Sequence, residues 1–289
     1  MSRSDTSDLE AMNATPAAAI NSEDWRSFFL GYSDIVLVAN SDEVDIDELT
    51  SRFPETTLFV FFNKVYKVLS EPFTRAAVLV SRSGAQGANL VKSGKVSKVL
   101  PYFDKGSFLG IINLTIGGSE RPSPASAFGD VKVRHLDLTD VFAPFYPPTS
   151  LPTSGFALCF WLANLQLGVR VTLAGFSSKR SERYQVFDVH DWTFEQVVLR
   201  LMYRRGKIDI LGRERTNPYA ELSAHFPEYS PTEIAFTANE VLGERLVNLS
   251  SIVDRLMHVT RFLRFVDRTY KKLKPKTRKE KRWEAMEGK

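Results

Sequence analysis

The fold is decided by residues 151–176, LPTSGFALCFWLANLQLGVRVTLAGF, in which a turn of small residues, an apolar helix and an apolar strand follow one another. Residues 154–167 are apolar around most of the helix circumference, which predicts a helix buried on several sides. Residues 169–174 have the pattern of a buried strand and end at a glycine. An apolar strand directly after a buried helix is typical of α/β proteins with a parallel sheet.

The same alternation of strands and helices runs along most of the chain. We expect strands at 34–39, 57–62, 76–81, 108–114, 130–134, 169–174 and 207–211, and helices at 23–30, 45–52, 89–98, 154–167, 193–205 and 232–273. The pattern predicts an α/β, Rossmann-like fold with a mainly parallel sheet flanked by helices, and with further helices at the C-terminal end. The expected parts are a disordered segment, a catalytic domain, a helical extension and a basic mobile tail, at 1–22, 23–225, 226–274 and 275–289.

The turn that opens the buried helix is a candidate anion-binding site. Thr153, Ser154 and Gly155 offer two hydroxyl groups and free backbone N–H groups at the positive end of a helix dipole, which suit a phosphate. The alternative is an ordinary helix N-cap, a role that serine and threonine often fill. The spacing of this turn from Gly175–Phe176 and from His190 favours a ligand site.

A histidine heads the next predicted helix. His190 stands where it could accept a proton beside the proposed phosphate site. Glu195 follows in the first turn of the helix expected at 193–205. The alternative is a surface or capping histidine, with a glutamate that complements the helix dipole whatever the function.

Polar residues also follow two earlier strands. Asn40 and Ser41 come directly after the apolar run 34–39, and Asn63 follows the run 57–62. Ligands of open parallel sheets bind at the carboxyl ends of the strands. These side chains are therefore candidates for the same site, although asparagine and serine are also common turn residues.

Two of these patterns resemble motifs of the sialyltransferase family. The family's small motif reads roughly Pro-Ser-Thr-Gly, followed by an apolar helix and a strand that ends in Gly-Phe. Pro152–Gly155 and Gly175–Phe176 stand at those places. The very-small motif is a histidine, four residues and a glutamate, which His190 and Glu195 match.

The family's large motif is matched in part. That motif opens with a strand ending in Val-Gly-Asn-Ser and has a second asparagine after the next strand. Residues 38–41, VANS, and Asn63 stand there, but Ala39 replaces the glycine and Phe61 stands where an arginine is frequent. The family also carries a His-Tyr motif before the catalytic histidine, and residues 183–187 contain no histidine. The resemblance therefore leaves the acceptor side of the site open.

The resemblance covers residues 34–210 and implies an inverting, metal-independent glycosyltransferase. The implied donor is CMP carrying a 2-keto sugar acid, either Kdo or sialic acid, and the implied acceptor is a glycan or glycolipid of bacterial lipopolysaccharide or capsule. His190 would be the catalytic base, and Glu195 would orient the histidine loop. The implied donor-binding residues are Asn40, Ser41, Asn63, Thr153, Ser154, Gly155, Gly175 and Phe176.

Composition agrees with one large domain in a reducing compartment. A chain of 289 residues that is 43% hydrophobic can bury one substantial core. The single cysteine, Cys159, lies inside the predicted apolar helix and cannot form an internal disulfide. The first residues lack a signal-peptide pattern, and no run approaches the ~18 apolar residues of a membrane span. Animal sialyltransferases carry an N-terminal anchor and disulfides, and this sequence shows neither pattern, so the resemblance implies a bacterial cytoplasmic enzyme.

Charge is concentrated at the C-terminal end. Residues 261–289 hold 12 Lys and Arg against 4 Asp and Glu, whereas the rest of the chain is mildly acidic. Apolar residues spaced three or four apart in 253–273 predict a basic amphipathic helix, which fits an anionic inner-membrane surface through residues 253–289. The alternative is a helix that packs on its own domain with a solvated basic face. No nucleic acid is expected, since no groove-reading motif accompanies the charge.

No metal or organic cofactor is expected. Residues 45–47, DID, fit the acidic pair of metal-dependent sugar transferases but also the acidic first turn of a helix. The sequence contains neither a dinucleotide fingerprint nor a Walker loop. Two other functions stay open. One is a metal-dependent phosphoester hydrolase that uses Asp188, His190 and Asp191, and the other is a non-catalytic scaffold that binds membrane or a glycan-assembly complex through residues 250–289.

Overall fold

The computed structural model divides the chain into two compact units, Met1–Arg213 (unit 1) and Glu214–Lys289 (unit 2). It describes residues 22–82, 84, 89–177, 189–212, 218–260 and 266. The division falls before the helix Pro218–His225, called α8, whereas the sequence pattern places the end of the catalytic domain at residue 225. The difference arises because α8 contacts the long helix that follows it and so belongs to unit 2.

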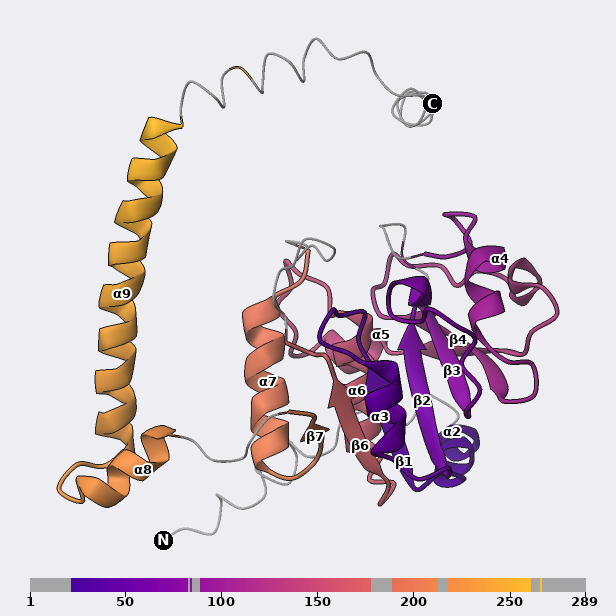
Figure 1. Cartoon of the computed structure of the whole chain (residues 1–289), viewed down its shortest axis with the longest axis horizontal. Helices are drawn as coiled ribbons and strands as arrows, with labels where there is room; N and C mark the ends of the chain where they lie inside the picture. Colours follow the sequence, from indigo (N-terminus) through magenta and orange to yellow (C-terminus); the bar gives the residue numbers. More distant parts are fainter. Residues whose placement is uncertain are drawn as a thin grey trace, which may run out of the picture. The chain divides into compact units, whose positions relative to one another are not determined.

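Unit 1 is built on a sheet of seven parallel strands, which confirms the predicted α/β, Rossmann-like class (Figure 1). The strand order is β5-β4-β3-β2-β1-β6-β7. The strands are β1 Asp34–Val38, β2 Thr57–Phe62, β3 Ala77–Arg82, β4 Phe108–Thr115, β5 Val133–Asp137, β6 Arg170–Ala174 and β7 Asp209–Ile210. Every residue of β1, β2 and β3 is buried, because helices and loops cover both faces of the sheet.

The strand order contains one reversal, and it lies between β1 and β6. From β1 the chain builds the sheet outward to β5, then returns and places β6 on the other side of β1. The two strands pair in register, from Asp34 opposite Arg170 to Val38 opposite Ala174. At such a reversal the loops after the two strands leave in opposite directions and open a crevice at their carboxyl ends. The fold therefore brings the loops after residues 38 and 174 to the sheet edge at which ligands of such folds bind.

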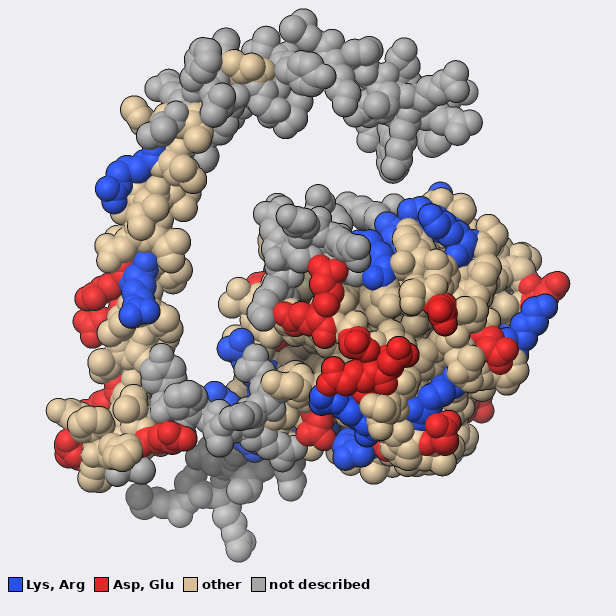
Figure 2. Space-filling model, in the orientation of Figure 1, with Lys and Arg blue, Asp and Glu red and all other residues tan. Residues whose placement is uncertain are grey.

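Helices cover the two faces of the sheet unequally. The larger core joins one face to four helices, and the smaller core joins the other face to two helices and several loops. The first group is α2 Ser22–Leu30, α5 Thr139–Phe142, α6 Ser154–Asn164 and α7 Trp192–Arg204, and the second is α3 Ile46–Ser51 and α4 Val96–Val99. The described residues of unit 1 also form three 3₁₀ turns, at Val65–Lys67, Leu100–Tyr102 and Ala125–Phe128. On the face of unit 1 seen in Figure 2, acidic side chains gather near the middle and basic side chains group at the upper edge.

Some expected elements differ from the structure. The helix expected at 89–98 is reduced to Val96–Val99, because Gly94 adopts a left-handed conformation with φ of 62° and ends the preceding turn. The strand expected at 130–134 begins and ends three residues later, at Val133 and Asp137, since Gly129 also has a positive φ of 77°. The remaining strands agree with the pattern to within two residues at either end.

Unit 2 contains α8 and α9, the latter spanning Pro231–Val259. Ser230 and Glu233 form a capping box at the start of α9, each side chain accepting from the other's backbone N–H. The part of the expected helix 232–273 beyond residue 260 lies, apart from residue 266, outside the described residues, as do the segments 1–21 and 275–289. Within the described parts of the chain, no helix is both long and apolar enough to cross a membrane.

Candidate functional site

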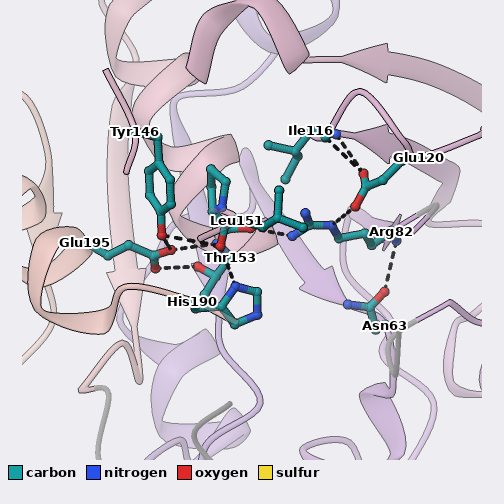
Figure 3. Close-up of polar contacts among 11 residues, drawn as sticks. Asn63, Arg82, Ile116, Glu120, Tyr146, Leu151, Thr153, His190 and Glu195 are labelled. Carbon is teal, nitrogen blue, oxygen red and sulfur yellow. Dashed lines mark hydrogen bonds and ion pairs between the residues drawn. The ribbon is translucent and has the colours of Figure 1, made fainter. Parts of the chain in front are cut away.

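The predicted site residues gather at the carboxyl edge of the sheet, around the reversal between β1 and β6 (Figures 1 and 3). Asn40 and Ser41 follow β1, and Asn63 follows β2. Two further contributions come from α6, which begins at Ser154, and from His190, which lies just before α7. These residues therefore lie at the carboxyl ends of the strands, where the sequence pattern predicted the site.

Thr153 caps α6 and is itself held by α7. Its hydroxyl accepts a hydrogen bond from the Phe156 N–H at 3.2 Å and donates one to Glu195 Oε2 at 2.7 Å. Its backbone N–H donates to Glu195 Oε1, also at 2.7 Å. Both polar groups of Thr153 are therefore used within the protein, so this residue positions the turn and is not free to bind a ligand directly.

The next two residues, Ser154 and Gly155, are buried, yet no other described residue uses their donors. The backbone N–H groups of Ser154 and Gly155 and the Ser154 hydroxyl have no hydrogen-bond partner among the residues that the structure describes. They occupy the first turn of α6, whose eleven residues direct the positive end of their dipole at this point. An anion at this turn would meet two backbone donors and one hydroxyl.

Glu195 is the buried anchor between the two helices. It is 3% exposed, and its carboxylate accepts three hydrogen bonds, two from Thr153 and one from the Tyr146 hydroxyl at 2.9 Å (Figure 3). Burial outweighs these donors and the nearby Arg82 guanidinium, and raises the pKa of Glu195 to about 7. The same burial and the adjacent carboxylate raise the pKa of Tyr146. Glu195 thus fixes the α6 turn and does not contact His190 through a hydrogen bond.

His190 is held by a carbonyl in a defined tautomer. Its Nδ1 lies 2.6 Å from the Leu151 carbonyl oxygen, and because a carbonyl can only accept, Nδ1 carries the proton. In the neutral ring Nε2 is then unprotonated, and it has no hydrogen-bond partner among the described residues. Burial and, to a lesser extent, the Arg82 charge lower the pKa of His190, despite the Leu151 hydrogen bond. The geometry leaves Nε2 as a proton acceptor.

Two glycines of the proposed motif are explained by close packing. A Cβ on Gly155 would lie 2.4 Å from the Phe176 ring, so the absence of a side chain lets Phe176 pack directly on the start of α6. Gly175 has a φ of 76°, and a Cβ there would lie 2.5 Å from Val44 and 3.0 Å from Ser41. The loops after β1 and β6 can therefore approach each other and α6 only with glycine at these positions.

The two asparagines are partly used for local structure. Asn40 Nδ2 donates to the Phe62 carbonyl at 2.8 Å, which links the ends of β1 and β2. Asn63 has a left-handed φ of 47°, and its Oδ1 accepts from the Arg82 N–H at 3.1 Å. These bonds leave Asn40 Oδ1 and Asn63 Nδ2 without a partner in the described part of the chain. Each asparagine thus offers one polar atom at the sheet edge.

A buried ion pair that the sequence pattern did not indicate supports the site. Arg82 Nε donates to Glu120 Oε1 at 2.8 Å, and an Arg82 amino group donates to the Pro152 carbonyl just before the α6 turn (Figure 3). Glu120 Oε2 accepts from the Ile116 N–H at 2.8 Å. Both side chains are less than 9% exposed. Arg82 is the last residue of β3, and Glu120 and Tyr146 lie outside the strands and helices, where no motif distinguishes them in the sequence.

The acidic pair at residues 45–47 serves a helix. Asp45 is the N-cap of α3, and its carboxylate accepts from the Glu48 N–H at 2.9 Å. Asp191 likewise caps α7 by accepting from the Phe194 N–H at 2.9 Å. The described residues contain no group of three or more His, Cys, Asp or Glu side chains placed to hold a metal ion. Asp188 and the segment 183–187 lie outside the described residues.

Comparisons of the chain with protein-family models, with curated proteins and with solved structures found no match.

Proposed function

We propose that this chain is an inverting glycosyltransferase that moves a 2-keto sugar acid from a CMP-linked donor to a glycan acceptor. The observation that carries the proposal is the arrangement of His190 and the α6 turn. An imidazole with a free Nε2 and free helix N-terminal donors stand together at the carboxyl edge of the sheet, where the strand order reverses. One group can take a proton while the other receives negative charge.

These two groups suit a single displacement. The acceptor hydroxyl oxygen forms a bond to the anomeric carbon of the sugar as the bond from that carbon to the CMP phosphate oxygen breaks. His190 Nε2 takes the hydroxyl proton, and the electron pair of the broken bond leaves with CMP. The Leu151 carbonyl keeps the proton on Nδ1 and stabilises the imidazolium that forms. The donors of Ser154 and Gly155 stabilise the phosphate of the leaving CMP.

The choice of a CMP-linked donor rests on the resemblance to sialyltransferase motifs. The hydrogen bonds described above change the roles proposed for some of the matching residues. Asn40, Asn63 and Ser154 are proposed to contact the nucleotide and phosphate, since each has a polar atom to offer. Thr153 and Glu195 are proposed as positioning residues. The acceptor is proposed to be a lipopolysaccharide or capsule glycan, assembled at the cytoplasmic face of the inner membrane.

The test is release of CMP from CMP-sialic acid and CMP-Kdo by the purified full chain, with lipooligosaccharide acceptors present. We expect turnover of one of these donors, no turnover of UDP-, GDP- or ADP-sugars, and unchanged rates with a strong chelator. Because a metal-dependent hydrolase would lose activity with chelator and a scaffold would show none, either result would refute the proposal.

A further inference from the structure

The long helix α9 of unit 2 carries an apolar strip that the other described residues of unit 2 leave exposed. The strip begins after Arg245 and follows one side of the helix. Its members are between 48% and 67% exposed, although all are large aliphatic residues: Leu246, Leu249, Ile252, Val253 and Leu256. Apolar residues side by side on this scale mark an interaction surface.

The strip has the seven-residue period of a coiled coil. Leu242, Leu249 and Leu256 lie seven apart, in the a positions of a heptad, and Ile252 occupies a d position three residues after Leu249. In the sequence the same register continues with apolar residues at Val259, Leu263, Val266, Tyr270 and Leu273. The b, c and f positions of the described helix include the polar residues Glu240, Glu244, Ser250, Ser251, Asp254 and His258. A repeat of 3.5 residues keeps one face toward a partner helix along the whole length.

The first half of that face lies beside α8, which leaves Val241 and Leu242 46% and 49% exposed. A groove of about 580 Å³ lies between the two helices, lined on the α8 side by Leu222, Phe226 and Tyr229 and on the α9 side by Val241, Leu242 and Arg245. Arg245 occupies a d position, where the repeat otherwise has apolar residues, and its side chain lines this groove. Beyond it the apolar strip continues without α8, so a partner is needed for the second half of the helix.

The charges of α9 argue against a lipid partner. The helix holds four acidic residues and two basic ones, so its net charge has the sign that anionic lipid repels. A second copy meets no such repulsion. The e positions, Leu246 and Val253, belong to the strip, and the g positions are Asn248 and Arg255, so Arg255 is the one charged residue among these four. Like charges therefore do not face each other across a pair of these helices.

We propose that copies of this chain assemble through α9 into a left-handed coiled coil of more than two strands. Leucine at a and a β-branched residue at d, as in Leu249, Ile252 and Leu256, favour three or four strands over two. The assembly holds several catalytic units together and does not depend on the function of unit 1.

The experiment is the mass of the full chain in solution, measured by light scattering at rising concentration. We expect a mass three or four times that of one chain. Leu249→Glu with Leu256→Glu places carboxylates at two a positions and should reduce the mass to that of one chain. Both leucines are exposed in the single chain, so the helix signal in circular dichroism should persist in this variant.

The matched control is Ser251→Glu with His258→Glu, which adds the same two carboxylates seven residues apart on the polar face. This variant should keep the mass of the wild type. A wild-type chain that stays a monomer at every concentration would overturn the proposal without reference to any variant. So would a monomer that sediments with lipid vesicles, or two double variants that dissociate equally.

Discussion

His190 acquires its chemistry from one backbone carbonyl. The Leu151 oxygen accepts from Nδ1, which leaves Nε2 as the basic atom of the neutral ring. Leu151 is fixed in turn, because its N–H donates to the Val189 carbonyl at 2.8 Å. Burial lowers the pKa of His190 below its usual value of 6.5, so the ring is neutral and able to accept a proton at pH 7.

We expect His190→Ala to reduce turnover by about 10²–10⁴-fold, the usual loss for a general base, while CMP affinity changes little. The exposed His258 offers a control, and His258→Ala should leave turnover unchanged. In the wild type, kcat/KM should fall with decreasing pH with a midpoint below 6.5, since protonated Nε2 cannot act as base. Steady-state kinetics of both variants and of the wild type across pH decide the matter. Near-normal turnover of His190→Ala would remove the assigned role.

At the residue scale, the sequence identified site residues that belong to a local pattern. It missed site residues whose partners are distant in the sequence. The turn at Thr153 and the position of His190 could be read from spacing. Glu120 could not, because it meets Arg82 only after the loop following β4 folds back on itself. The role of Glu195 was also read differently: the sequence suggested contact with the histidine loop, and the structure shows bonds to Thr153 and Tyr146.

Glu195 connects two elements that build the site. It belongs to the first turn of α7, yet its carboxylate holds the N-cap of α6, so the two helix starts are fixed relative to each other. A shift of α7 would move the α6 donors. The pKa of Glu195, raised to about 7, means that the folded protein binds this proton more tightly than the unfolded chain.

We expect rising pH to destabilise the folded protein through Glu195. Between pH 4.5 and about 7 the folded state retains the Glu195 proton that the unfolded state loses, so rising pH reduces the free energy of unfolding. Glu195→Gln cannot ionise, and chemical denaturation should show its stability relative to wild type rising by about 3 kcal/mol across this range. Glu195→Ala should be less stable than Glu195→Gln at every pH, because the Thr153 N–H and the Tyr146 hydroxyl lose their acceptor, at about 1–3 kcal/mol each. Parallel curves for wild type and Glu195→Gln would show that the carboxyl does not titrate in this window.

Element prediction succeeded where hydrophobic runs were long. The strands β1, β2 and β3 are buried on both sides and appear in the sequence as unbroken apolar runs. It failed where a backbone conformation decided the outcome. Residues 89–98 have helix-forming residues, but Gly94 turns the chain away after a short turn.

On the scale of the whole molecule, the candidate binding site and the exposed aliphatic strip belong to different units of the chain. Unit 1 holds the polar groups at the sheet edge, and the described part of unit 2 consists of two helices with an exposed aliphatic strip. The sequence predicted a C-terminal helical part but assigned its start to residue 226, since the contact of α8 with α9 cannot be seen in periodicity. The predicted membrane attraction of residues 253–289 rests on charge that falls mostly beyond the described residues and stays a prediction.

The central claim is that the sheet edge of unit 1 is a CMP site, and calorimetric titration of the full chain with CMP, UMP, AMP and GMP tests it most directly. We predict binding of CMP in preference to the others. Asn63→Ala and Ser154→Ala should each weaken CMP binding by about 1.5–3 kcal/mol, as expected for loss of a hydrogen bond to a charged group. Ser126→Ala, at an exposed serine in the Ala125–Phe128 turn, should not change it. Absence of CMP binding, or equal CMP affinity in all of these folded variants, would contradict the account.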